Sequence, residues 1–316
     1  MSPPVSSGVW PGPRQAAPPF LREVADGVFA YIQPDGGWCV SNAGFVVGED
    51  VVLLVDTAAT RKRTELLGEA VIGVAGRGPD IVVNTHHHGD HVFGNARFAA
   101  QATIVAHEGT RSEMAAAGLG LRYLFPDVEW GDDPLILPTL TFADSITLFV
   151  QQARVDVRHP GPAHTTNDSI VWVPDRRVLF AGDIVMSGVT PYCLMGSVTG
   201  SLTAVESLRE LGATTIVPGH GQVGGPELLD QTAAYLHFIL DLARAGMEEG
   251  RDALEVARSA QLGEFGSLID AERIVGNLHR AYLDLAEPDW LGKPIDVASS
   301  FREMVAFHGG LPTCHA

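Results

Sequence analysis

The segment Thr85-His86-His87-His88-Gly89-Asp90-His91 decides how this chain is interpreted, because it concentrates metal-binding side chains in one short stretch. The apolar run before it predicts a buried strand over residues 79–84. The histidines therefore stand at the carboxyl end of a strand, and the Gly-Asp-His turn after them leads into residues that can open a helix. So many ligands at a strand end rarely arise for packing alone. We therefore predict a metal site.

The spacing inside this segment predicts two neighbouring ligand clusters. Alternate side chains of an extended segment share a face, so His86 and His88 point together while His87 points away. Asp90 and His91 lie at the turn and can aim at a second point nearby. Imidazole and carboxylate ligands suit zinc, with iron or manganese as the alternatives. The expected centre is dinuclear.

Three later residues are candidates for the ligands that this segment lacks. His164 lies in a turn-rich stretch before the strand 169–173, whereas Asp183 and His220 each follow a strand and a glycine. Asp183 can bridge two metals through its two oxygens. A lone histidine is usually structural, but the joint placement favours ligation. We expect the other histidines to be structural or exposed, namely His87, His107, His159, His237, His279, His308 and His315.

The order of these motifs resembles that of the metallo-β-lactamase-fold hydrolases. The motifs are His-x-His-x-Asp-His at 86–91, Gly-Pro-Ala-His-Thr at 161–165, Phe-Ala-Gly-Asp at 180–183 and Val-Pro-Gly-His-Gly at 217–221, preceded by Leu-Val-Asp-Thr at 54–57. The resemblance implies an α/β fold of the four-layer αββα type. It also implies the site residues: one metal held by His86, His88 and His164, a second by Asp90, His91 and His220, a bridge through Asp183, and Asp56 orienting a ligand.

Departures from the family pattern narrow the expected chemistry. The zinc β-lactamases commonly carry Cys or another residue where this chain has Asp183, so an ester or thioester is favoured over a β-lactam. The flavin-linked di-iron relatives carry Glu where this chain has His88, which argues against an oxygen or nitric oxide reductase. Gly-x-Ser-x-Gly is absent, so an α/β-hydrolase mechanism has no support.

Three flanking segments, 36–44, 185–191 and 309–312, resemble the second-ring cyclases of bacterial aromatic polyketide pathways. That resemblance implies a dinuclear zinc cyclase-thioesterase acting on a carrier-protein-bound polyketide. Two metal ions can supply hydroxide near neutral pH and polarise a carbonyl, which suits thioester hydrolysis, and enolate stabilisation suits aldol ring closure. Asp90 is the candidate to orient water or move a proton. The alternatives are a generic thioesterase or lactonase of the glyoxalase II kind, a mononuclear iron dioxygenase, and a non-catalytic metal-binding protein.

Composition favours one globular domain over residues 21–316, since a chain of 316 residues buries roughly three quarters of its unfolded surface. We expect strands at 28–32, 43–47 and 51–55, a helix near 63–75, and a helical part over about 226–310. Residues 1–20 predict a flexible Pro-rich tail that lacks the pattern of a signal peptide. The odd, widely spaced Cys39, Cys193 and Cys314 favour a reducing cytoplasm. No apolar run approaches the roughly 20 residues of a membrane span.

The net charge of −17 excludes nucleic acid and anionic membranes as expected partners. An acidic carrier protein then needs a local basic patch, for which Arg61, Lys62 and Arg63 are the candidates and Arg176-Arg177 the second choice. An ordinary solvated helix start explains the first cluster equally well. The sequence does not fix the oligomeric state, and a homo-oligomer is one alternative. A large flat substrate is expected to bind between aromatic and polarisable side chains. The candidate substrate contacts are Trp38, Phe125, Trp130, Tyr192 and Met195, each of which could equally belong to the core.

Overall fold

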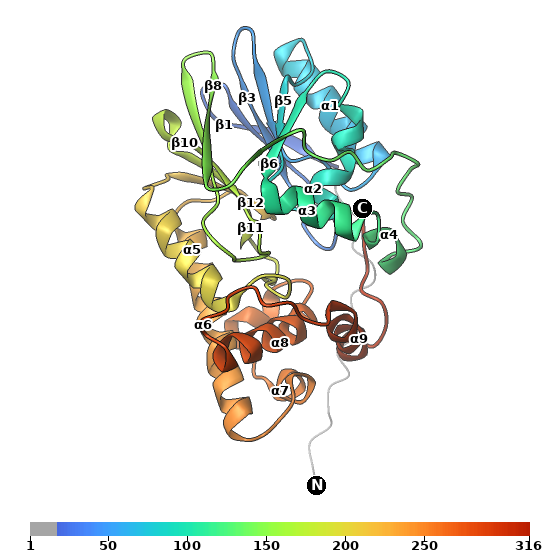
Figure 1. Ribbon diagram of the computed structural model, residues 1–316, viewed down its shortest axis with the longest axis vertical. Helices are drawn as coiled ribbons and strands as arrows, with labels where there is room; N and C mark the ends of the chain where they lie inside the picture. The colour runs from blue at the N-terminus through green and yellow to red at the C-terminus, as the bar shows by residue number, and fades with distance from the viewer. Residues whose placement is uncertain (1–17) are drawn as a thin grey trace.

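Residues 18–316 are described by a computed structural model, drawn as a ribbon in Figure 1. The predicted tail over residues 1–20 lies outside this part of the chain except for its last three residues, and Phe20 is already the first residue of a strand. Within the described residues the strands form one sheet of seven and one of five. Sequence reasoning placed the first strands later, from residue 28 onward.

The larger sheet is antiparallel in its first half and parallel in its second. Its strands run in chain order across the sheet. The pairs change from antiparallel to parallel after β4, where the chain begins to cross over through helices. The strands are β1 (Phe20–Ala25), β2 (Val28–Ile32), β3 (Ala43–Val47), β4 (Val52–Val55), β5 (Ile81–Val83), β6 (Thr103–His107) and β7 (Leu140–Phe142).

The smaller sheet carries the remaining strands in the order β12-β11-β10-β9-β8. Only β11 and β12 pair in parallel within it, so their carboxyl ends meet at one edge. That edge is where Asp183 and His220 stand. The strands are β8 (Ser145–Val150), β9 (Ala153–Arg158), β10 (Ile170–Val173), β11 (Val178–Met186) and β12 (Thr215–His220).

Successive side chains of the strands point to opposite faces of each sheet, and both faces are apolar. One face packs against the other sheet and the opposite face packs against helices. Leu53 and Phe180 belong to the valine-rich core between the sheets, whereas their neighbours on the strands face outward. On the outer face of the first sheet, Leu54 packs with Leu67 of α1 (Arg61–Ala75), and on that of the second sheet Leu179 packs with Leu208 of α5 (Val198–Glu210). The fold is therefore the predicted α/β sandwich of four layers, αββα.

The expected helix near 63–75 starts two residues earlier because Thr60 caps it. The Thr60 hydroxyl accepts a hydrogen bond from the Arg63 amide at 3.3 Å, and the helix ends at Gly76 in the left-handed conformation. Two further helices follow on this side of the molecule, α3 (Glu108–Ala117) and the short α4 (Leu121–Leu124). These helices carry the chain from β6 toward the cavity described below.

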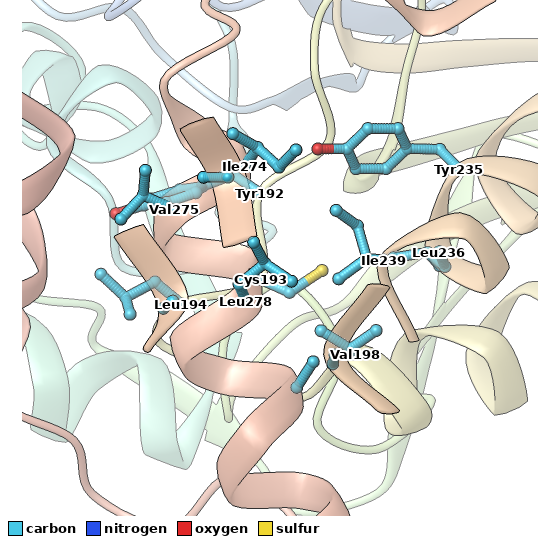
Figure 2. Close-up of a cluster of buried hydrophobic side chains, with 14 of the residues drawn as sticks. Tyr192, Cys193, Leu194, Val198, Tyr235, Leu236, Ile239, Ile274, Val275 and Leu278 are labelled. Carbon is cyan, nitrogen blue, oxygen red and sulfur yellow. The ribbon is translucent and has the colours of Figure 1, made fainter. Parts of the chain in front are cut away.

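The last part of the chain is helical, as the sequence predicts for about 226–310. Figure 1 shows these helices gathered at the lower end of the molecule, below the sheets. Figure 2 shows their core, where side chains of α6 and α8 meet the segment 192–198 that follows β11. The helices are α6 (Glu227–Glu248), α7 (Ala253–Ser259), α8 (Arg273–Ala286) and α9 (Val297–His308). None of the helices in residues 18–316 is both long and apolar enough to span a bilayer.

Candidate metal centre

The predicted ligands converge where the carboxyl ends of β5, β11 and β12 meet. His86 and His88 follow β5, and the one-turn helix α2 (Gly89–Val92) carries Asp90 and His91. Within the described residues the seven side chains form two groups whose ligand atoms lie within 4.8 Å of one another. The groups are His86, His88, His164 with Asp183, and Asp90, His91 with His220.

Asp183 lies between the two groups. Its Oδ2 is 3.3 Å from Nε2 of His164 and 3.3 Å from Nε2 of His220, and its Oδ1 is 3.2 Å from Nε2 of His91. One carboxylate therefore faces ligands of both groups, which is the geometry that a bridging role requires. The bridging role itself stays a prediction.

Asp56 holds the ligand segment from behind. Its carboxylate accepts hydrogen bonds from the amide and the hydroxyl of Thr85, both at 2.7 Å, and from Nδ1 of His91 at 2.9 Å. Since the hydroxyl of Thr85 donates to Asp56, it is left to accept from Nδ1 of His86 at 3.1 Å. Such outer contacts fix the tautomer and the ring orientation of a metal-binding histidine. Asp56 has the positioning contacts that the resemblance implies.

The other histidines are oriented by backbone carbonyls and by a thioether. Nδ1 of His164 donates to the carbonyl of Tyr192, and Nδ1 of His220 donates to that of Gly36 at 2.8 Å. His88 is turned the other way: its Nδ1 lies 2.8 Å from Nε2 of His164, and its Nε2 lies 3.3 Å from the sulfur of Met195. Five imidazole nitrogens thus point toward the two groups of ligands.

Burial and charge divide these histidines into two kinds. Burial lowers the pKa of His164 to about 4 and holds those of His86 and His88 well below the usual value. Burial has the same effect on His220, but the carboxylates of Asp183 and Asp90 outweigh it and raise its pKa to about 9. The pKa of His91 is likewise raised well above its usual value, because nearby carboxylates overcome the effect of burial.

The donor set fits two divalent cations. Neutral imidazoles and ionised carboxylates are the ligands that zinc takes in proteins, and all seven here are buried except His88, which is partly exposed. Nε2 of His91 and Oδ1 of Asp183 are buried 3.2 Å from each other, yet in the described structure neither makes a hydrogen bond of good geometry to the other or to any other group. A buried polar atom without a partner costs about 1–3 kcal/mol, so each has a reason to meet a cation. These residues would hold the metals.

A cavity of about 220 Å³ opens directly onto this centre. Of the predicted substrate contacts, Trp38, Tyr192 and Met195 line it. Phe125 and Trp130 do not: the ring of Phe125 packs 5.9 Å behind Trp38, and the indole of Trp130 donates to the Phe125 carbonyl at 3.1 Å. The apolar lining that sequence reasoning missed consists mainly of Phe93, Leu121, Leu124, Met186, Val297 and Phe301.

Two further lining residues carry polar groups. His87, which was expected to be structural or exposed, is buried with its Nδ1 3.1 Å from the side-chain nitrogen of Asn167, and it also lines the cavity. Burial lowers its pKa to about 4. Arg273, at the start of α8, was not predicted at all. Arg273 lies far along the chain from the ligand segment, and no sequence motif around it indicates that it belongs to the site.

The proposed basic docking patch is largely engaged within the chain. Arg61 forms a bidentate pair with Asp133 at 3.0 and 3.1 Å. The guanidinium of Arg63 donates to the side chain of Gln33 at 2.7 Å and to the carbonyl of His315. Lys62 is exposed on the first turn of α1. Two of the three cations are thus already paired with groups of this chain.

Comparison with known proteins agrees with this geometry. A family model described as the metallo-beta-lactamase superfamily matches residues 36–220. The metallo-beta-lactamase type 2 of Bacteroides fragilis is 24% identical over 223 residues, which cover 67% of this chain and 83% of that protein. The hydroxyacylglutathione hydrolase of Methylococcus capsulatus is 30% identical over 139 residues, or 43% of this chain and 45% of that protein.

A solved structure supports the fold in particular. The metallo-beta-lactamase from Pontibacter korlensis superposes with a TM-score of 0.58 at 21% identity, covering 70% of this chain and 99% of that one. Members of the superfamily are metal-dependent hydrolases that use divalent metals, typically zinc. The family match spans more than half of the chain and contains all seven residues of the metal centre. The chain therefore belongs to the metallo-beta-lactamase superfamily.

Proposed function

We propose that the chain is a dinuclear zinc thioesterase that also closes a ring of an aromatic polyketide delivered on a carrier protein. The observation that carries this proposal is the cavity at the metal centre, because its walls are mainly aromatic and apolar apart from the metal-centre residues and Arg273. Such walls suit a large flat substrate. Part of the wall comes from α8 and α9, which lie beyond the segment that the family model matches.

The residues of the centre have separate tasks in this proposal. Two bound cations would supply a nucleophile near neutral pH and polarise the thioester carbonyl. Asp56 fixes the ring of His91, and the backbone carbonyl of Gly36 fixes that of His220. Asp90 lines the cavity and is the proton acceptor. Although burial opposes ionisation, His91 and His220 hold the pKa of Asp90 below its usual value, so it is ionised at neutral pH.

A second candidate is hydrolysis of a small thioester, as in the hydroxyacylglutathione hydrolase that matches part of the chain. It shares the same centre and differs in the substrate body. A glutathione conjugate carries carboxylates and favours a basic surface, whereas Arg273 is the only lysine or arginine lining the cavity within residues 18–316. The apolar wall favours the aromatic substrate.

The carrier protein remains the proposed partner. Lys62 is the exposed cation of the predicted patch, while Arg61 and Arg63 contribute to docking only if they exchange their present contacts. Charge reversal at Lys62 is expected to raise the KM for carrier-bound substrate and to leave a small soluble thioester unaffected. Unchanged kinetics on both substrates would remove Lys62 from the docking site.

One assay separates the two candidate functions. The zinc-loaded protein is incubated with an N-acetylcysteamine thioester of a partly cyclised aromatic polyketone, and free thiol and product mass are followed together. Thiol release with loss of water supports the cyclase-thioesterase. Thiol release without loss of water supports a simple thioesterase. If neither thiol release nor a cyclised product is found, both candidate functions are contradicted. His86→Ala, which removes a metal ligand, is the matched inactive control.

A further inference from the structure

Arg273 is a buried cation in the wall of the catalytic cavity. Its side chain is only 2% exposed, although arginine is seldom buried without a purpose for its charge. The residue opens α8, and α8 is held firmly by the packing of Ile274, Val275 and Leu278 seen in Figure 2. The start of the helix, and with it Arg273, is thereby fixed against the cavity.

The guanidinium is held flat by an aromatic ring. Its central carbon lies 4.3 Å from the centre of the Trp38 ring. The indole of Trp38 in turn donates to Glu272 at 2.5 Å, so the ring cannot rotate freely beneath the cation. This stacking leaves the in-plane edges of the guanidinium for hydrogen bonds.

The hydrogen bonds of Arg273 do not use all of its donors. One terminal nitrogen donates to the carbonyl of Thr190 at 3.1 Å, and the other lies 2.9 Å from the carboxylate of Asp270. Nε is buried without a hydrogen-bond partner in the described part of the chain. Because buried donors are nearly always satisfied, this N–H requires an acceptor that the protein does not supply.

The position of Arg273 relative to the metal centre suggests what that acceptor is. The ring of Tyr192 lies 6.1 Å from the ring of His164 and 5.9 Å from the guanidinium carbon of Arg273. Tyr192 therefore lies near both a metal ligand and the cation, and all three residues line the cavity. A ligand with its reacting carbonyl at the metals and a flat body along Trp38 and Tyr192 extends toward Arg273.

We propose that Nε of Arg273 binds an anionic oxygen, a carboxylate or an ionised enol, at the far end of a planar aromatic substrate. Charge-assisted hydrogen bonds are the strong ones, and burial strengthens them further. Asp270 and Glu272 do not compete for this donor, since Asp270 lies against a terminal nitrogen and Glu272 accepts from Trp38. The inference rests on the proposed function only for the aromatic substrate body, so a binding experiment tests it separately.

The test compares two ligands that differ in one charge. Binding of anthraquinone-2-carboxylate and of anthraquinone-2-carboxamide to the zinc-loaded protein is measured by calorimetry. Arg273→Met is expected to lower the affinity for the carboxylate by about tenfold or more. The affinity for the carboxamide should change by less than about twofold. Arg122→Met is the matched control, because Arg122 stacks on the lining residue Phe93 at 5.3 Å without lining the cavity itself. It should leave both affinities unchanged.

Other outcomes overturn the proposal. If Arg273→Met loses affinity equally for the acid and the amide, Arg273 only supports the cavity wall. If it loses affinity for neither, the metals alone hold the acid. Arg273→Lys keeps the positive charge beside Asp270 and removes the Nε donor, so it tests the contact if the methionine variant does not fold. An acid preference equal to that of the wild type in Arg273→Lys would contradict the Nε contact. Failure of thioester hydrolysis with this preference intact would refute the proposed function alone.

Discussion

Asp56 contacts the candidate ligand His91 but does not belong to either group of ligands itself. It adopts a left-handed backbone conformation, with φ of 60°, which Asp and Asn tolerate better than most residues. Asp56→Asn should therefore preserve the local fold while removing the charge that faces His91. Loss of such an outer contact typically costs about 10–100-fold in metal affinity.

Zinc competition with a chromophoric chelator measures this loss. Asp175→Asn, an exposed position on the turn between β10 and β11, is the control and should bind zinc as the wild type does. Equal zinc affinity in Asp56→Asn and Asp175→Asn would show that Asp56 does not position His91.

The raised pKa of His220 predicts a pH dependence of metal binding. With a pKa of about 9, His220 is protonated at pH 7 in the metal-free chain, whereas a metal ligand must be neutral. Binding must expel that proton, and His91 with its raised pKa adds to the effect, so zinc affinity should rise with pH between 7 and about 9. His164, with a pKa of about 4, is already neutral at pH 7 and adds nothing to this slope. Calorimetry at pH 7 in buffers of different ionisation enthalpy should detect release of about one proton or more; no release refutes the prediction.

At the scale of elements, the parallel pair β11 and β12 sets the spacing of the ligands they carry. A Cβ added to Gly219 would lie 1.9 Å from Oδ1 of Asp183, so only glycine lets β12 pass this close. Gly219→Ala should displace the Asp183 carboxylate and lower zinc affinity and activity together. Gly73→Ala is the matched control, because this exposed glycine inside α1 has nothing within 4 Å of an added Cβ.

The two glycine variants should shift stability in opposite directions. Gly73→Ala is expected to stabilise by about 0.5–1 kcal/mol, since alanine loses less backbone entropy in a helix. Gly219→Ala should lower the melting temperature. Full zinc binding by Gly219→Ala would show that β12 can move away from Asp183 at little cost.

The elements that the sequence predicts well are those with strong local signals. His86 to His91 follow a buried strand, and the strands 28–32 and 43–47 have the predicted bounds. The hairpin of β8 and β9 was not predicted, although Ile146, Leu148 and Val150 alternate with more exposed residues and Val155 and Val157 alternate with charged ones. The helix near 63–75 was expected to begin two residues later than α1 does, because the prediction did not use the Thr60 cap that decides the boundary.

For the whole molecule, the C-terminal helices turn a metal centre at a sheet edge into a walled cavity. Phe301 of α9 stacks edge-on against Trp38, with ring centres 6.3 Å apart, and lines the cavity. Helical periodicity predicts that α8 and α9 have apolar faces. It does not predict which distant segment those faces meet, so Arg273 and Phe301 could not be assigned to the site from sequence.

Phe301→Ala tests whether this wall selects the substrate. Loss of the ring should reduce kcat/KM for an aromatic acyl thioester by about tenfold or more, because aromatic contacts and buried area are lost together. An acetyl thioester, too small to reach α9, should lose less than about twofold. Parallel losses for both substrates would mean that Phe301 acts on folding or on the metals instead of on substrate choice.

The proposed thioesterase requires two metal ions that act together in one hydrolytic centre. Metal-free protein is titrated with zinc while thiol release from an aromatic thioester is followed. We predict no activity without zinc and a rise that ends at two zinc ions per chain, one for each group of ligands. Full activity at one zinc ion per chain, or activity that persists in the chelated protein, would contradict the dinuclear centre.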